Sequence, residues 1–290
     1  MQASVRVKSQ QDTVERLQST GDVARVPTNS LERALLVFKA VGSRSGGLTN
    51  ADLSRKLGIP RSSCSYLLTR LEQAGYLRRD ADSNRYTVGF EALALANSAL
   101  REMKIRSLAE PILLDIVQRT GLILHIGILE SGRVLIVDRF QDHLTSGVPP
   151  KKSVSPRSAR DRCFVGGELL PNTTALGKVL LAGLSHAALA DLLEAHPLTG
   201  ETTKSVVASE QLALQLEEVR RSGYATANGE HAQGLRALAV PLYDQRQSVC
   251  AAISMTGDES HKAWDDPQGT LALVRETATD LSRKLARVRD

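Results

Sequence analysis

A run of hydrogen-bonding side chains between positions 61 and 70 is the stretch of the sequence best suited to bind another molecule. Hydroxyl groups both donate and accept hydrogen bonds, and guanidinium groups pair with phosphates. Such a set suits the DNA major groove, where side chains meet base edges and phosphates together. We expect Ser62, Ser63 and Tyr66 to reach base edges. Phosphates are the expected partners of Arg61 and Arg70. No acidic residue interrupts the set before Glu72, and its members are Arg61, Ser62, Ser63, Ser65, Tyr66, Thr69 and Arg70.

The apolar residues of the same stretch indicate that a helix carries these side chains. They recur at intervals of three and four, which places them on one helical face and the polar set on the other. Pro60 suits the start of this helix, because an amide hydrogen in a first turn has no helical partner. The inward-facing residues are Cys64, Leu67, Leu68 and Leu71.

Two further helices are predicted upstream. Ser30 is expected to cap the first of them. The second begins at a capping box of Thr49 and Asp52 and ends at Gly58, because glycine adopts the left-handed conformation at low cost. With the turn at Pro60, the three helices form a helix-turn-helix, which is typical of DNA-binding domains. The alternative is a small helical domain whose third helix is merely solvated.

Two short strands, 76–79 and 85–88, are predicted around the turn-rich segment that separates them. This hairpin is the wing of a winged helix, and Arg78, Arg79 and Arg85 are expected to reach phosphates or an adjacent minor groove. Positive charge is concentrated in this part of the chain. Residues 30–89 contain ten basic and five acidic residues, an excess equal to the whole-chain net charge of +5. This location strengthens the case for a phosphate-bearing partner.

The segment 90–106 is rich in alanine and leucine, which favour helix. Its apolar residues fall on more than one face, so a helix here needs partners on both sides. A two-fold DNA site requires two copies of the reading helix, so we expect this connecting helix to pair two subunits. The alternative is a plain domain-spanning helix in a monomer.

Length and composition bound the remaining possibilities. A chain of 290 residues with 42% hydrophobic residues is long enough for two packed domains. We divide it into a disordered tail (1–29), a winged helix-turn-helix (30–89), the connecting helix (90–106) and a C-terminal domain (107–290). No apolar run approaches the roughly 20 residues that span a bilayer, so no membrane partner is expected. Three scattered cysteines argue against a disulfide framework or a zinc site and favour a reducing cytoplasm: Cys64, Cys163 and Cys250.

The C-terminal domain alternates between helical and strand patterns. Helices are predicted at 107–120, 174–182, 186–195, 210–221 and 268–287. Two hairpins, 122–129 with 134–140 and 235–243 with 249–255, provide the strands. Strands that pair as hairpins, with helices between them, predict an α+β fold with a largely antiparallel sheet.

From residue 31 to its end the chain resembles the IclR family of transcription regulators. In the DNA-binding part the resemblance rests on residues 30–35, 48–63, 67–72, 75–77 and 85–89. In the C-terminal part it rests on 137–139, 221–225, 240–241, 252–254 and above all on the Ala-Leu-Gly-Lys segment at 175–178. The resemblance implies a regulator, more commonly a repressor, that works as a dimer or a tetramer. It also implies a GAF-like C-terminal domain that binds a small-molecule effector.

The resemblance also implies where the effector binds. Asn172, Thr173 and Thr174 precede a helix whose N-terminus suits a carboxylate. Ser254 and Thr256 share one face of a strand. The alternative is that such hydroxyls satisfy only local main-chain groups. A facing loop, 224–235, supplies the remaining candidates, which are Asn228, Gly229 and Glu230.

Two features depart from the family pattern. Relatives that bind small polar acids often carry an acidic residue near Ala227 and a cysteine near Ala237, so alanine at both positions predicts a more apolar effector, such as an aromatic acid. The basic, Ser- and Pro-rich segment 141–171 is longer than usual, and it is expected either to cover the pocket, to contact DNA or to have no role. Cys163 lies there beside two arginines, at 160 and 162, which leaves a redox role or a bystander thiol open.

The main rival hypothesis is an enzyme or an adaptor that uses the winged helix as an interaction module. The sequence contains no P-loop, dinucleotide fingerprint or G-x-S-x-G elbow, and its six histidines have no metal-ligand spacing. We therefore expect no catalytic residue, no cofactor and no metal. His125, within a predicted strand, is expected to be a core residue that could also line the pocket.

Overall fold

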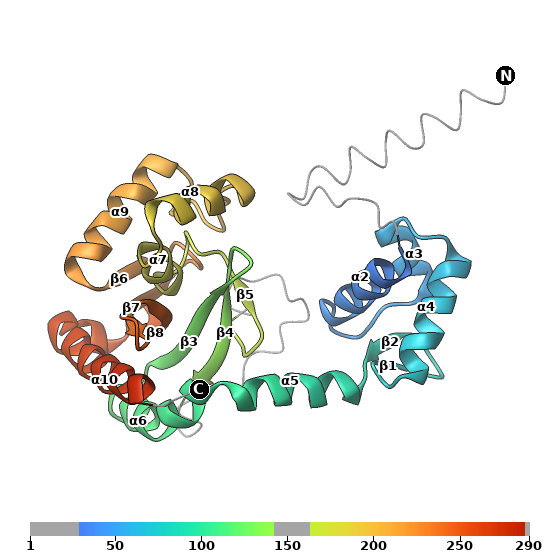
Figure 1. Cartoon of the computed structure of the whole chain (residues 1–290), viewed down its shortest axis with the longest axis horizontal. Helices are drawn as coiled ribbons and strands as arrows, with labels where there is room; N and C mark the ends of the chain where they lie inside the picture. Colours follow the sequence, from blue (N-terminus) through green and yellow to red (C-terminus); the bar gives the residue numbers. More distant parts are fainter. Residues whose placement is uncertain (1–28, 142–162, 288–290) are drawn as a thin grey trace. The chain divides into compact units, whose positions relative to one another are not determined.

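The computed structural model describes residues 29–141 and 163–287 and separates the chain into two compact units, 1–98 and 99–290 (Figure 1). The expected disordered tail, apart from residue 29, and most of the basic segment 141–171 lie outside the described residues. The N-terminal unit is helical with a small hairpin, and the C-terminal unit is built on one sheet. Each unit is considered by itself below.

The N-terminal unit is the predicted winged helix-turn-helix. Its described residues up to position 88 form three helices and a two-stranded antiparallel hairpin, namely α2 (Ser30–Gly42), α3 (Asn50–Leu57), α4 (Arg61–Gln73), β1 (Leu77–Arg79) and β2 (Tyr86–Val88). The inward stripe of α4 is buried against the other two helices at Cys64, Leu67 and Leu68. A main-chain bridge between Leu48 and Tyr86 ties the segment before α3 to the hairpin. The hairpin is therefore part of the folded unit.

The helix ends follow local chemistry, with one correction. Asn29, rather than Ser30, caps α2, because the Asn29 side chain accepts a hydrogen bond from the first turn at 2.8 Å. The capping box of Thr49 and Asp52 is confirmed, with both of its hydrogen bonds present. Gly58 ends α3 with φ 66°, the left-handed conformation that the sequence predicted.

The connecting segment is two helices rather than one. The sequence predicted a helix over 90–106, but α5 (Phe90–Glu102) ends before Met103 and α6 (Lys104–Thr120) begins after it. No residue of α5 is buried. In contrast, α6 packs on the sheet, where the Arg106 Nε donates to Asp138 at 2.9 Å. This tertiary contact redirects the chain at a point where helical propensity alone favours continuation.

One antiparallel sheet of six strands forms the centre of the C-terminal unit and confirms the predicted α+β class. Its order is β5-β4-β3-β8-β7-β6. The two edge strands were not predicted, and β6 takes up the first part of the loop expected at 224–235. The bounds are β3 (Ile123–Glu130), β4 (Arg133–Phe140), β5 (Glu168–Leu169), β6 (Ala225–Asn228), β7 (Leu235–Tyr243) and β8 (Val249–Asp258).

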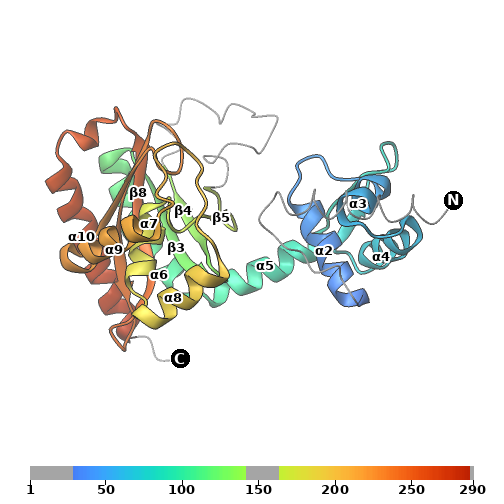
Figure 2. The same cartoon turned by 90° about the horizontal axis from the view of Figure 1, so that it is seen from above.

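Helices cover both faces of this sheet (Figures 1 and 2). One face packs large apolar side chains against α6 and α10 (Pro267–Arg287), with the short η2 (Lys262–Trp264) beside them. The other face is covered by α7 (Ala175–Ala182), behind which lie α8 (His186–Ala195) and α9 (Ser209–Ser222). The sheet residues under α7 are small, and they include Ala225, Ala227, Ala237, Ala239 and Ala252. Small side chains leave space between α7 and the sheet.

Candidate functional site

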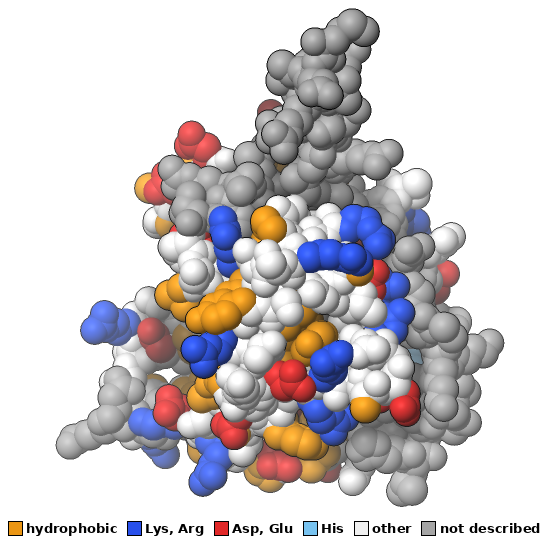
Figure 3. Space-filling view, turned by 90° about the vertical axis from the view of Figure 1, so that its right-hand side faces the viewer, with side chains coloured by type: hydrophobic (Ala, Val, Ile, Leu, Met, Phe, Trp, Pro, Cys, Tyr) orange, Lys and Arg blue, Asp and Glu red, His pale blue; other side chains and the backbone are white. Residues whose placement is uncertain are grey.

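The polar face of α4 lies on the surface of the winged unit. Six of its seven predicted residues are exposed, and Ser63 is half-buried. Figure 3 looks from the right-hand side of Figure 1, where α4 lies, and shows Lys and Arg side chains spread among uncharged and acidic ones. Because the apolar stripe of α4 is buried, the polar side chains can meet a partner without any change in the fold.

Tyr66 and Arg70 form one unit on this face. The Tyr66 side chain is 59% exposed, so its ring and hydroxyl are accessible to a partner. The Arg70 guanidinium lies 5.4 Å from the centre of the Tyr66 ring, and its Nε donates to the tyrosine hydroxyl at 3.4 Å. The pair therefore presents a phenol and a cation in a fixed relation.

The three arginines of the wing have different surroundings. Arg78 lies 5.6 Å from the centre of the Phe90 ring, and Arg79 lies 5.9 Å from that of Tyr86; both arginines are exposed. Arg85 is half-buried, and its Nη1 donates to the carbonyl of Gly47 at 3.0 Å. Arg85 therefore holds the hairpin to the loop that precedes α3, whereas Arg78 and Arg79 are open to a partner.

A cavity lies between α7 and the sheet, at the place where the sheet residues are small. The volume open to the centres of water-sized molecules is about 30 Å³, so the cavity is small. Its lining is mostly apolar. The lining residues are His125, Cys163, Leu169, Thr174, Ala175, Leu176, Ala227, His231, Leu235, Ala237, Ser254 and Thr256.

Three of the eight predicted effector residues line this cavity, and they are Thr174, Ser254 and Thr256. Asn172 and Thr173 do not. The Asn172 amide donates to the carbonyls of Thr199 and Val206, both at 2.8 Å. The Thr173 hydroxyl lies 3.1 Å from a carboxylate oxygen of Glu201 and 3.2 Å from the Leu170 carbonyl, and either oxygen can accept its one proton. These two side chains therefore hold neighbouring segments in place.

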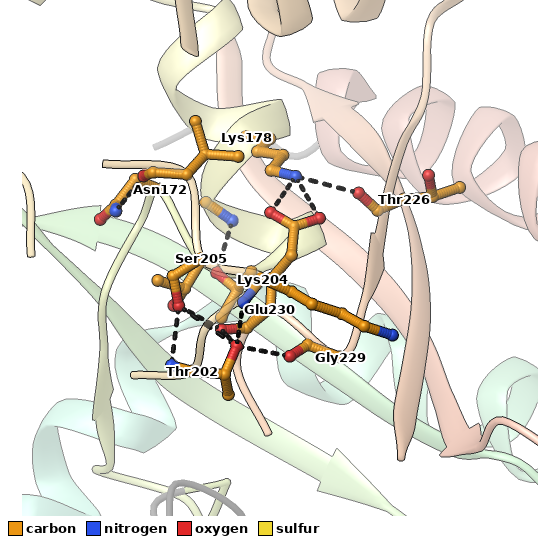
Figure 4. Close-up of polar contacts among 12 residues, drawn as sticks. Asn172, Lys178, Thr202, Lys204, Ser205, Thr226, Gly229 and Glu230 are labelled. Atoms are coloured by element: carbon orange, nitrogen blue, oxygen red, sulfur yellow. Dashed lines mark hydrogen bonds and ion pairs between the residues drawn. The ribbon is translucent and has the colours of Figure 1, made fainter. Parts of the chain in front are cut away.

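The other three predicted residues also lie outside the cavity lining. Asn228 is exposed at the end of β6. Gly229 accepts a hydrogen bond at its carbonyl from the Thr202 hydroxyl at 2.7 Å. Glu230 forms a buried ion pair with Lys178, whose Nζ lies 2.6 and 2.7 Å from its two oxygens (Figure 4). Burial lowers the pKa of Lys178, and the hydrogen bond to Glu230 opposes that shift. This segment is a scaffold for the cavity wall.

The N-terminus of α7 opens into the cavity. Thr174 caps the helix, because its hydroxyl accepts a hydrogen bond from the Gly177 amide at 3.1 Å. Gly177 has no room for a side chain, since a Cβ there would lie 2.2 Å from the Pro171 carbonyl oxygen. Ala175 and Leu176 line the cavity, and amides of a first helical turn have no carbonyl partner within the helix. This end of α7 is therefore suited to a carboxylate or carbonyl oxygen.

His125 adds a hydrogen-bond acceptor to the same cavity. Its side chain is buried on β3, and its Nε2 has no hydrogen-bond partner. Burial, followed by the charge of Arg139, lowers the pKa of His125 to about 3, while a hydrogen bond to the main chain of Cys163 opposes the shift. The ring is therefore neutral near pH 7. Because its other nitrogen is the one left for Cys163, Nε2 carries the lone pair.

Two residues of the wall and a carboxylate bonded to one of them were not predicted as a group. The Cys163 Sγ lies 3.5 Å from the His231 Nε2, and the His231 Nδ1 lies 2.5 Å from a carboxylate oxygen of Glu201. The sequence analysis singled out Cys163 for its basic neighbours, at 160 and 162, which lie outside the described residues. It gave no signal for the other two, because they come from loops 30 positions apart and meet only in the folded chain.

Within residues 29–141 and 163–287, no cluster of three or more His, Cys, Asp or Glu side chains has the arrangement of a metal site. None of the helices described is both long and apolar enough to span a membrane.

Comparison with known proteins agrees with this architecture. The profile of the IclR helix-turn-helix domain matches residues 30–81, and that of the bacterial transcriptional regulator IclR C-terminal domain matches residues 97–283. Together they cover both units.

Individual relatives match over most of their own lengths. The HTH-type transcriptional regulator XynR of Escherichia coli K12 is 29% identical over 78% of this chain and 85% of its own length. The transcriptional repressor IclR of the same strain is 27% identical over 87% of this chain and 88% of its own. An IclR homologue from Microbacterium hydrocarbonoxydans, crystallised with 4-hydroxybenzoate, is 23% identical with a TM-score of 0.71, over 89% of this chain and 99% of its own.

These relatives are named as transcription regulators, which favours a DNA-binding regulator over the rival hypothesis of an enzyme. The profile matches, the α+β unit and the winged helix-turn-helix all lead to the same conclusion. The chain belongs to the IclR family of bacterial transcription regulators.

Proposed function

We propose that this regulator is a homodimeric, sequence-specific repressor whose affinity for DNA is controlled by a small aromatic acid. The observation that carries the proposal is the exposed, acid-free face of α4, held in place by a buried apolar stripe. Tyr66, Ser62 and Ser63 would read base edges. Arg61, Ser65, Thr69, Arg70, Arg78 and Arg79 would position the unit on phosphates and sugars.

The dimer is proposed from the surface of α5. Phe90, Leu93 and Leu95 are 74%, 66% and 57% exposed in the single chain. A helix with exposed apolar side chains and no buried residue gains stability by packing against another helix. A second copy of α5 would supply that partner and pair two reading helices for a palindromic site.

The effector class follows from the polar atoms of the cavity. A carboxylate fits the first turn of α7 at Ala175 and Leu176, with hydroxyl donors at Ser254 and Thr256. A hydroxyl group elsewhere on the ligand would donate to the lone pair of His125. The apolar wall, which includes Ala227 and Ala237 in place of polar groups, suits an aromatic ring between them. A hydroxylated aromatic acid meets all three requirements, and a structural relative was crystallised with one.

The small size of the cavity indicates how effector binding could change DNA binding. Because the cavity is small without a ligand, an aromatic acid would bind an expanded form of the domain. A ligand that favours one conformation shifts the population toward it. We propose that the expanded form spaces the two reading helices differently, so that effector binding and operator binding oppose each other.

The DNA part is tested by selecting bound sequences from a random double-stranded pool with the purified protein at physiological salt. A recovered palindrome supports the proposal. Arg70→Ala is expected to weaken binding to all sequences alike, whereas Tyr66→Ala relaxes the preference at one position of each half-site. The proposal fails if neither variant changes binding to the recovered site.

The effector part is tested by calorimetry with 4-hydroxybenzoate, benzoate and phenol. We expect 4-hydroxybenzoate to bind about tenfold more tightly than benzoate, because only it donates a hydrogen bond to His125. A His125→Leu variant should remove that difference and leave the affinity for benzoate nearly unchanged. A wild-type protein that does not distinguish the two acids would contradict the assignment of His125.

A further inference from the structure

Cys163, His231 and Glu201 have the order of a nucleophile, a base and an orienting acid. The thiol sulfur lies 3.5 Å from the His231 Nε2, and the His231 Nδ1 lies 2.5 Å from Glu201. This is the geometry in which a histidine takes a proton from a nucleophile while a carboxylate fixes its ring. Cys163 and His231 both line the cavity, so this pair borders the space that an effector would occupy.

The base and the acid are held by a buried scaffold. The side chains of His231 and Glu201 are only 6% and 9% exposed. Their two loops are joined next to them, because the Thr202 and Ser205 hydroxyls donate to the Glu230 carbonyl at 3.2 and 2.7 Å (Figure 4). The ion pair of Glu230 with Lys178, described above, fixes the same loop to α7. The three residues, called the relay below, are therefore held in place by the surrounding structure.

The rest of the cavity indicates which compounds this sulfur would meet. The first turn of α7, at Ala175 and Leu176, offers main-chain amides to a carbonyl oxygen. The Nε2 of His125 is a buried polar atom without a partner, which marks the space as one that a polar ligand enters. The remaining wall is apolar. A small, flat, unsaturated carbonyl compound suits this combination.

We propose that Cys163 captures α,β-unsaturated carbonyl compounds by reversible conjugate addition, so that this regulator also senses electrophiles. The sulfur forms a bond to the β-carbon of the compound, and the carbon–carbon π bond breaks. The thiol proton passes to the Nε2 of His231 and then to the α-carbon, while the amides of α7 stabilise the intermediate enolate oxygen. All atoms of both reactants remain in the adduct.

Addition suits this cavity better than substitution. It expels no leaving group and consumes no water or oxidant. One adduct forms per chain, which suits a regulator, since the signal persists until the compound is released. The inference rests on the proposed function only in using the same cavity.

The experiment exposes the full-length protein to trans-cinnamaldehyde and measures by peptide mass spectrometry how fast each cysteine is modified. Cys250 is exposed and serves as the rate reference within the same molecule, and Cys64 is buried in the winged unit. We expect Cys163 to react at least about tenfold faster than Cys250, because a positioned base typically contributes about 10²–10⁴-fold. Equal rates at Cys163 and Cys250 would overturn the proposal.

Variants of His231 and Glu201 distinguish a role in proton transfer from a purely structural role. His231→Gln is expected to lower the maximal rate at Cys163 at least about tenfold, and Glu201→Gln by less, with the concentration for half-maximal rate unchanged in both. A rise in that concentration without a fall in the maximal rate would indicate a structural role and overturn the relay. Should a variant misfold, the wild-type rate ratio still decides the proposal.

A Cys163→Ser variant distinguishes failure of this inference from failure of the proposed effector site. It cannot form the adduct, so any binding of 4-hydroxybenzoate that it retains reports on the acid site alone. Binding of the acid without adduct formation in the wild type would overturn only the covalent step. Adduct formation without binding of the acid would support the covalent step and overturn the proposed effector class.

Discussion

The face of α4 and the wall of the cavity are both polar, but they are built in opposite ways. The seven side chains on α4 come from ten consecutive residues, and most are exposed. The polar atoms of the cavity come from segments as distant as β3 and β8, and most are buried. A surface made by one helix depends on the helix alone, whereas the wall depends on many tertiary contacts. The two regions should therefore respond differently to substitution.

The strongest contrast concerns stability. Lys178→Met leaves the carboxylate of Glu230 buried without its partner, and we expect a loss of about 3–5 kcal/mol in the free energy of unfolding. Urea unfolding followed by the fluorescence of Trp264, the single tryptophan, reports on this unit. The matched change Arg70→Met on the exposed face of α4, followed by circular dichroism because Trp264 lies in the other unit, should cost less than about 0.5 kcal/mol. Similar losses of unfolding free energy in the two variants would contradict the expected difference between the cavity wall and the face of α4.

Acid should destabilise the cavity side more than the α4 side. The folded-state pKa of His125, about 3, lies below its ordinary value of 6.5, so below pH 6.5 the unfolded chain binds a proton that the folded chain does not. Stability therefore falls with decreasing pH by about 1.4 kcal/mol per unit, or about 2 kcal/mol from pH 6.5 to 5. Urea unfolding of the wild type and of His125→Gln at both pH values isolates this contribution. A wild type and a variant with parallel pH profiles would contradict the neutral buried ring.

Binding should show the reverse contrast. Arg70→Ala is expected to reduce affinity for the selected operator about tenfold and to lower the slope of log affinity against log salt by about one, with stability unchanged. Lys284→Ala, which removes an exposed cation from α10 in the other unit, is the control and should leave both quantities as they are. Fluorescence anisotropy with labelled operator at several salt concentrations makes the measurement. An equal effect of the two variants on affinity and on the salt slope would contradict contact between α4 and DNA.

The smallest expected effect lies within the winged unit. Thr49→Ala removes the cap of α3 and should lower the thermal stability of this unit by about 1 kcal/mol. Thr49→Ser keeps the hydroxyl and should restore most of that loss. Hydrogen exchange of the α3 amides resolves this change from the unfolding of the other unit. An unchanged exchange rate in Thr49→Ala would show that tertiary packing alone fixes the start of α3.

The sequence predicted what local patterns determine. The stripe of α4, the box at Thr49 and the stop at Gly58 are each encoded within a few residues, and all three are present. It did not predict the break at Met103, because only the docking of α6 on the sheet reveals it. The short edge strands β5 and β6 carry too few residues for a periodic signal.

The cavity wall shows the same limit more clearly. Ser254 and Thr256 were found because alternation along one strand is a local pattern. The scaffold role of Glu230 and the approach of His231 to Glu201 were missed, because loop residues carry no periodicity that would pair them. Pairing of such residues becomes visible only after the chain has folded.

The small residues under α7 would set the dose response of the proposed regulator. Under the proposed mechanism a ligand binds only the expanded conformer, so its apparent dissociation constant would be the intrinsic one divided by the fraction of chains that are expanded. Sensitivity is then tuned by the packing between α7 and the sheet as much as by contacts to the ligand. Exchanges among the small residues under α7 would change how much effector triggers a response and leave its chemical identity alone.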